Sequence, residues 1–185
     1  MPDKNGLKHP WKLVCTDGGK TAPAEEIIEK VFSMSKRYLQ GQFKALNPQK
    51  YKGDPTRIFY RSSLELRCMS YFDSHMDVIW WSSEEIIVPY KDAGTGKNRR
   101  YFPDFVINIR NKEGSIETLM IEVKPSRETI QPSHSKGKNK QAFLKEAMTW
   151  ATNSSKWSAA ERYCLDRKWK FTILTEKDIL GLKTK

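Results

Sequence analysis

The amino-acid sequence predicts an α/β fold in which helices flank a sheet, with a helical extension at the N-terminus. Three observations lead to this prediction. Apolar residues recur at helical spacing before residue 75 and after residue 140, strand-like segments lie between them, and a turn signal joins two of these segments. We expect residues 1–46 to form an arm and a helix, and residues 47–185 to follow the order helix, three strands, helical region, strand.

Length and charge narrow the classes of function. The 185 residues suffice for one domain with an appendage, and Lys and Arg total 33 against 22 Asp and Glu, a formal net charge of +11. This excess favours a polyanionic partner and argues against a protein that binds acidic ligands or buffers metal ions. Charge alone does not distinguish DNA, RNA and anionic lipid.

The chain is expected to be soluble and not exported, because it has no apolar run near the ~20 residues that span a bilayer and its first ten residues are polar. The cysteines, Cys15, Cys68 and Cys164, are odd in number and widely separated, which supports neither a disulfide framework nor a zinc knuckle. We expect reduced thiols, with Cys68 and Cys164 on apolar helix faces.

The N-terminal part divides into three stretches. Residues 1–20 lack periodicity and are expected to be loose until a partner orders them. Residues 21–39 predict a helix, with Pro23 in its first turn and an apolar stripe expected to pack on the domain. Residues 44–61 interleave five basic with three aromatic residues around Pro48 and Pro55, which indicates an extended basic connection, interpreted as a solvated linker.

The next elements are a helix and a strand. Ser62 and Ser63 open a helix with Glu65 in its first turn. Residues 78–81 are expected to be a short extended piece, and residues 86–90 a strand that Pro89 directs to a sheet edge or bulge, followed by a loop over residues 92–98.

The C-terminal half predicts a hairpin of residues 105–110 and 116–123, whose turn is marked by Asn111 to Gly114. Helical patterns then cover residues 143–151 and, as a second helix, residues 157–165. The last strand is expected at residues 169–174, before a capped terminal turn from Thr175.

The hairpin brings chemistry-bearing residues together. If it turns at Lys112–Glu113, Asp104 falls opposite Ile121 or Glu122, so that two carboxylates come within reach of one ion. The strand period of two places Glu122 and Lys124 on one face and turns Val123 into the core.

Two carboxylates beside an ammonium suit metal-assisted hydrolysis of a phosphodiester. Asp104 and Glu122 would hold magnesium, Lys124 would orient the attacking water, and Glu65 would contribute directly or through water. Alternatives remain open: Ser62-x-x-Glu65 fits a helix capping box equally well, Asp104 could cap a turn, and Glu122 and Lys124 could be ordinary solvent-facing strand residues.

With Pro103-Asp104 and Glu122-Val123-Lys124 in this order of elements, residues 60–175 resemble the PD-(D/E)XK, or restriction-endonuclease-like, nucleases. The resemblance implies an αβββαβ core with a mixed central sheet and a Mg²⁺-dependent DNA endonuclease, with Mn²⁺ expected to substitute. It also implies the catalytic set Glu65, Asp104, Glu122 and Lys124, and a metal-binding set of Asp104, Glu122, Val123 and Glu65.

Within that superfamily, residues 47–63, 81–90 and 100–105 resemble the head completion nucleases of T4-like tailed phages, and at greater distance the TnsA-type endonucleases that act on transposon ends. This resemblance implies a late assembly protein in the virion and host cytoplasm, acting on packaged DNA or its end, with portal or head-tail connector proteins as partners. The other class of function is a non-catalytic virion protein that binds DNA on a nuclease fold. The complete catalytic set favours the enzyme.

Five basic residues and one glutamine are candidates for contact with DNA phosphates, although basic loops are most often simply solvated. Three border the site in sequence, and three open the helical region that follows the hairpin, where a helix N-terminus can receive a phosphate. These candidates are Arg61, Arg99, Arg100, Lys138, Lys140 and Gln141. The sequence leaves the DNA structure that is cleaved and the oligomeric state open.

Overall fold

A computed structural model describes residues 39–133 and 139–180. The predicted helix of residues 21–39 lies almost wholly outside these residues, and Lys138 lies outside them as well. Within the described part of the chain, no helix is long and apolar enough to cross a membrane.

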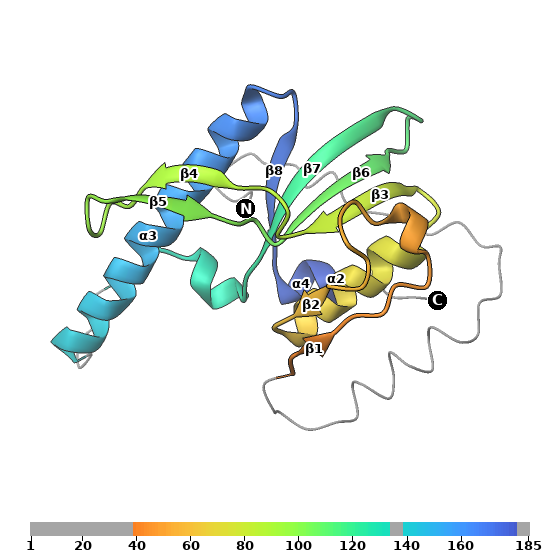
Figure 1. Cartoon of the computed structure of the whole chain (residues 1–185). Helices are drawn as coiled ribbons and strands as arrows, with labels where there is room; N and C mark the ends of the chain where they lie inside the picture. Colours follow the sequence, from red (N-terminus) through yellow and green to blue (C-terminus); the bar gives the residue numbers. More distant parts are fainter. Residues whose placement is uncertain (1–38, 134–138, 181–185) are drawn as a thin grey trace.

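The centre of the fold is a four-stranded mixed sheet (Figure 1). Its strands are β3 (Val78–Ser83), β6 (Phe105–Arg110), β7 (Ile116–Val123) and β8 (Lys170–Leu174), in the order β3-β6-β7-β8. β6 runs antiparallel to both β3 and β7, whereas β8 runs parallel to β7. The prediction of an α/β fold with a mixed central sheet and flanking helices is therefore confirmed.

Helices cover both faces of this sheet (Figure 1). α2 (Ser63–Ser74) and α4 (Glu176–Leu180) lie on one face, and α3 (Lys140–Leu165) lies on the other together with a small hairpin. Alternation along β6 divides the core accordingly: Phe105 and Ile107 pack toward α2, and Val106 packs toward α3. Cys68 and Cys164 are buried, one in each of these two layers, as predicted.

The first strand of the central sheet is β3, which the sequence predicted only as a short extended piece at residues 78–81. β4 (Val88–Lys91), close to the strand predicted at residues 86–90, pairs with β5 (Asn98–Tyr101) in a separate two-stranded sheet, and residues 92–97 between them are the predicted loop. Asp92 closes the turn, because its carbonyl accepts hydrogen bonds from the Gly96 and Thr95 N–H groups and its carboxylate accepts one from Gly94. These main-chain and side-chain hydrogen bonds hold the turn of the hairpin.

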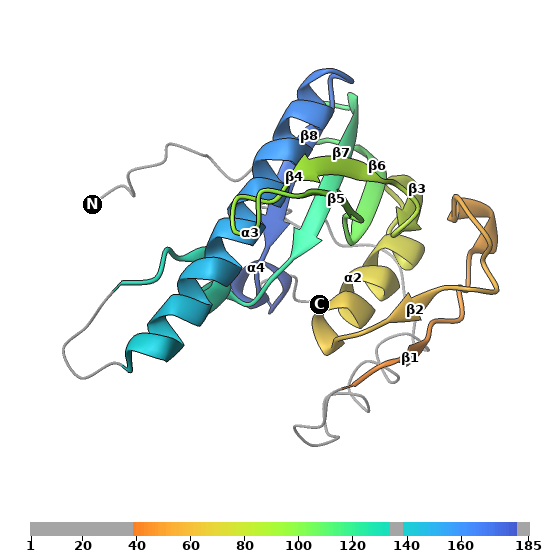
Figure 2. The ribbon, with the colours of Figure 1, turned by 60° about the vertical axis from the view of Figure 1, so that its left-hand side comes forward.

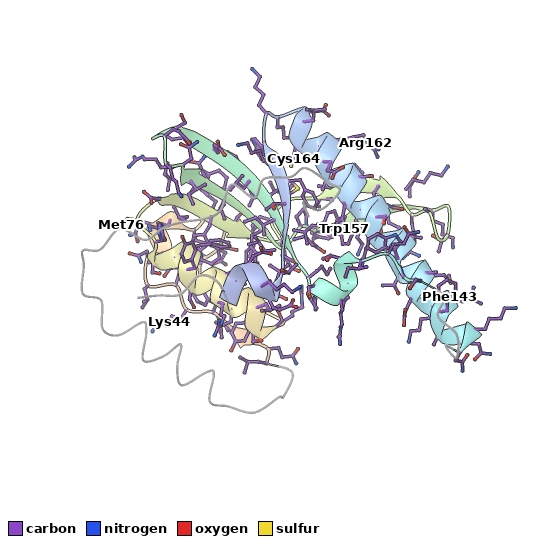
Figure 3. All side chains as sticks on the ribbon, turned by 180° about the vertical axis from the view of Figure 1, so that it is seen from behind. Lys44, Met76, Phe143, Trp157, Arg162 and Cys164 are labelled. Atoms are coloured by element: carbon purple, nitrogen blue, oxygen red, sulfur yellow. The ribbon has the colours of Figure 1, made fainter. Side chains whose placement is uncertain are left out.

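α3 is one helix of 26 residues where two helical patterns were expected. The polar residues Asn153 to Ser155 lie between the two predicted segments and the helix continues through them: Asn153 is buried and the Ser155 hydroxyl donates back to the Ala151 carbonyl. Figure 3, seen from behind, shows Trp157 and Cys164 on the part of α3 that lies against the sheet and Phe143 on the part that extends beyond it.

Residues 44–61 are docked on the domain, so their interpretation as a solvated linker was wrong. β1 (Gly41–Gln42) and β2 (Phe59–Tyr60) form a two-stranded ribbon beside α2, with the short 3-10 helix η1 (Pro48–Lys50) between them (Figure 2). The buried carboxylate of Asp73 in α2 accepts hydrogen bonds from the N–H groups of Leu46 and Asn47. This contact fixes the segment over a separation of 26 residues.

Candidate active site

The register of the β6–β7 hairpin brings Asp104 and Glu122 together. Phe105 lies opposite Ile121 and Val106 opposite Met120, so one further step along both strands sets Asp104 opposite Glu122. This is one of the two registers predicted from the turn, which closes through a hydrogen bond from the Gly114 N–H to the Asn111 carbonyl. The site thus lies where β6 begins and β7 ends.

Glu122 is the buried centre of the site, with 3% of its surface exposed. Its Oε1 lies 3.0 Å from Nζ of Lys124, and its Oε2 accepts a hydrogen bond of 2.6 Å from the Tyr101 hydroxyl. The contact with Lys124 follows from the period of two that the sequence predicted. Because both oxygens have partners, the orientation of this carboxylate is fixed before any ligand binds.

Asp104 is half-buried, and its Oδ2 accepts a hydrogen bond of 2.7 Å from the Val123 N–H. Burial and the neighbouring carboxylate of Glu122 raise the pKa of Asp104 well above its usual range. At Lys124, burial alone would lower the pKa of the ammonium, but Glu122 and Asp104 outweigh burial and raise it. One ammonium therefore faces two crowded carboxylates.

Glu65 caps its own helix and also lies near the carboxylate pair. Ser62 accepts a hydrogen bond from the Glu65 N–H, while the Glu65 carboxylate accepts bonds from the Ser62 hydroxyl and the Arg61 N–H. The capping interpretation of Ser62-x-x-Glu65 is therefore confirmed. Glu65 is nonetheless close enough to Asp104 to help raise its pKa.

Tyr101 is a site residue that sequence reasoning missed. It ends β5 and is 4% exposed, and burial together with Glu122 raises the pKa of its hydroxyl, which stays a hydrogen-bond donor. Its position three residues before Asp104 in the sequence could have indicated a site residue. That position could be interpreted only once residues 98–101 were known to be a strand of the β4–β5 hairpin.

Comparison with known proteins identifies the family. The family described as "TnsA-like endonuclease N terminal" matches residues 75–176, more than half of the chain. The chain belongs to this family. It is also 38% identical over 145 residues to the head completion nuclease of Enterobacteria phage T4, an alignment that spans 77% of this chain and 94% of that protein. The predicted family resemblance and the prediction of an endonuclease are thereby confirmed, and Asp104, Glu122 and Lys124 all lie inside the matched residues.

The basic candidates fall into two groups. Near the site, Arg61 forms an ion pair with Glu84 and also interacts with Glu65 and Asp104. Arg99 lies 3.1 Å from the carboxylate of Asp92, in the turn of the β4–β5 hairpin.

Arg100 lies beside Arg99 on β5, opposite Pro89, and is exposed. Lys140 and Gln141 are exposed in the first turn of α3, at the end that extends away from the sheet, so the structure does not bring them to Asp104 (Figure 1). The Gln141 N–H donates to the capping Asn139 side chain.

The donor set of the site fits a hard divalent cation. The carboxylates of Asp104 and Glu122 converge from adjacent strands, and a cation would offset both their burial and their mutual repulsion, which together raise the pKa of Asp104. Among residues 39–133 and 139–180, no three His, Cys, Asp or Glu side chains already form a metal-binding cluster. Magnesium, which keeps several waters and takes one or two protein carboxylates, does not require one.

Proposed function

We propose that this endonuclease hydrolyses the phosphodiester backbone of DNA with Mg²⁺, for which Mn²⁺ can substitute. The observation that carries the proposal is the buried Glu122 carboxylate, held 3.0 Å from the Lys124 ammonium at the strand end that faces Asp104. The net charge of +11 suits a polyanionic substrate.

Asp104 and Glu122 would hold the ion, with the Val123 backbone carbonyl as a further oxygen donor and Glu65 acting through a water molecule. Bound there, magnesium would neutralise the attacked phosphate, acidify a water molecule and stabilise the leaving oxygen. Lys124 would orient the attacking water and offset developing negative charge. Tyr101 would hold Glu122 in position, and the Val123 N–H would do the same for Asp104.

The similarity to a head completion nuclease supports a role in phage assembly, on packaged DNA or its end, in the host cytoplasm and then the virion. Portal or head-tail connector proteins are the partners proposed for this role. Arg61, Arg99 and Arg100 near the site would grip DNA phosphates; Lys138, Lys140 and Gln141 at the start of α3 would meet DNA farther from the cut. The family match favours a second candidate, a TnsA-like endonuclease acting on DNA ends.

The test is incubation of the purified chain with linear, circular, branched and single-stranded DNA in Mg²⁺, Mn²⁺, Ca²⁺ or excess chelator. Cleavage is expected in Mg²⁺ and Mn²⁺, and binding with little turnover in Ca²⁺, because calcium accepts looser geometry at the same carboxylates. Robust cleavage in chelator would contradict the metal proposal. Binding without cleavage in every metal would instead support a non-catalytic DNA-binding protein.

A further inference from the structure

A pocket lies next to the carboxylate pair, and of its lining residues only Arg61 has a role in the function proposed above. Its volume is about 510 Å³, and its walls come from the β1–β2 ribbon and from Ser83 and Glu84 at the end of β3. The Glu84 N–H donates to the Asp104 carbonyl, and Ser83 lies opposite Phe105. The pocket therefore opens beside Asp104 of the candidate active site.

One face of the segment ending in β2 supplies the chemistry of this pocket. Along this segment Arg57, Phe59 and Arg61 are exposed, while Ile58 is buried and Tyr60 is half-buried. The period of two puts the three exposed side chains on one face, and all three line the pocket. Phe59 has 53% of its surface exposed, so its ring is accessible to a ligand in the pocket.

The wall behind these side chains is preformed. Ile58 belongs to the core and its carbonyl accepts a 2.8 Å hydrogen bond from the Phe43 N–H, and Tyr60 packs against the same core. Gly41 lies across from Tyr60, and a Cβ at that position would come within 2.7 Å of the tyrosine hydroxyl oxygen. The absence of a side chain at Gly41 therefore leaves room for the Tyr60 side chain beside the neighbouring strand.

We propose that this pocket binds an unpaired DNA nucleotide beside the phosphate being cleaved. The base would stack on Phe59, and flanking phosphates would contact Arg57 and Arg61. The alternation of a cation, an aromatic ring and a second cation is how proteins bind single-stranded nucleic acid without reading its sequence. The inference rests on the proposed nuclease function and gives its substrate class: DNA that is single-stranded or splayed next to the cut.

Binding in Ca²⁺ tests the pocket without relying on cleavage. The probes are a fluorescein-labelled oligothymidylate of roughly 12 nucleotides, within the range of known single-strand sites, and a blunt hairpin duplex of equal charge. Phe59→Ala should weaken oligothymidylate binding by about 5- to 150-fold, the range measured for loss of one stacking partner, and change duplex binding by less than about twofold. Phe59→Trp, which retains a stacking surface, should bind like the parent.

Arg57→Ala and Arg110→Ala form a matched pair, because both remove one exposed arginine and Arg110 lies at the opposite end of β6 from the site. Arg57→Ala should reduce the salt dependence of oligothymidylate binding by about one phosphate contact, and Arg110→Ala should leave it unchanged. Thermal unfolding of each variant checks that the fold is retained.

Equal losses for both probes in Phe59→Ala, no loss for either, or failure of Phe59→Trp to match the parent would overturn the pocket assignment. Cleavage of splayed and blunt DNA in Mg²⁺ is measured separately on the same proteins. If Phe59 governs single-strand binding but the parent cleaves no DNA, the nuclease proposal fails and the pocket stands. If the parent cleaves both forms and Phe59→Ala changes nothing, only the pocket assignment fails.

Discussion

Replacing Asp104 with asparagine is expected to stabilise the metal-free enzyme and to remove most of the stabilisation that magnesium provides. The asparagine oxygen can still accept the hydrogen bond that Asp104 Oδ2 receives from the Val123 N–H at 2.7 Å. The substitution therefore keeps the shape and this contact of residue 104, and removes a carboxyl group whose ionisation beside Glu122 costs free energy. Cleavage should be lost in the same variant.

The size of the effect follows from the charges at the site. Two like charges about 4 Å apart repel by roughly 4 kcal/mol at an effective dielectric of about 20. The Lys124 ammonium, 3.0 Å from Glu122, and the partial exposure of Asp104 reduce this repulsion. We expect a net gain of about 1–3 kcal/mol in the free energy of unfolding, or about 3–10 °C in Tm for a chain of this size.

The assay is thermal unfolding of the parent and Asp104→Asn, each in chelator and in magnesium. Magnesium at about 100 times its Kd should stabilise the parent by about 2.7 kcal/mol and the variant by clearly less. Asp92→Asn is the matched control, because Asp92 is also buried but its charge is met by Arg99 and by hydrogen bonds from Gly94, Thr95 and Thr152. It should lower Tm and leave the magnesium shift intact. If the parent and Asp104→Asn shifted equally with magnesium, Asp104 would not be a metal ligand.

Three further predictions concern pH, Tyr101 and salt. Because the pKa of Asp104 is raised in the folded protein, the protonated carboxyl group of Asp104 contributes stability that is fully present below the unfolded pKa of about 3.9. This stability is lost as the pH rises through the folded pKa. The Tm of the parent in chelator should therefore fall relative to the Tm of Asp104→Asn between about pH 5 and about pH 8. A constant difference would contradict this. Tyr101→Phe removes the 2.6 Å hydrogen bond to buried Glu122, so it should lower Tm by about 3–10 °C and slow cleavage. The control is Tyr90→Phe in the same hairpin, which leaves that hydrogen bond in place and should cleave like the parent. The logarithm of the duplex affinity should fall linearly with the logarithm of salt concentration, by a slope of about −0.9 per phosphate contact, and the affinity should hardly depend on sequence. A salt-insensitive, sequence-selective footprint would argue against phosphate contacts as the main source of affinity.

The parts of the site that the sequence could predict depend on short-range geometry. The turn at Asn111 to Gly114 sets the β6–β7 register, and that register sets Asp104 opposite Glu122. The period of two then places Lys124 beside Glu122. Each step involves neighbouring residues, so hydrophobic pattern and turn chemistry were sufficient.

The parts that were missed or wrong depend on long-range contacts. Tyr101 reaches Glu122 only because the β4–β5 hairpin lies over this end of the sheet, and its turn is built by the side chain of Asp92. Residues 41–61 are docked because Asp73 receives the Leu46 N–H. No local pattern in the sequence records either contact. Glu65 is intermediate: its capping box is readable, but its approach to Asp104 is set by how α2 packs.

The most direct test of the account is single-turnover cleavage by Lys124→Ala in magnesium, together with its DNA binding in calcium. Lys170→Ala is the control, because it removes another lysine–glutamate pair, the 2.7 Å contact with Glu117 at the other end of the β7–β8 pairing. Lys124→Ala should slow cleavage by about 100-fold or more, as loss of a charge-stabilising group does in other enzymes. Its DNA affinity should stay within about threefold of the parent, because one of many cationic contacts is lost, and Lys170→Ala should match the parent in both assays. Undiminished cleavage by Lys124→Ala, or a collapse of DNA binding along with cleavage, would contradict the catalytic assignment of this site.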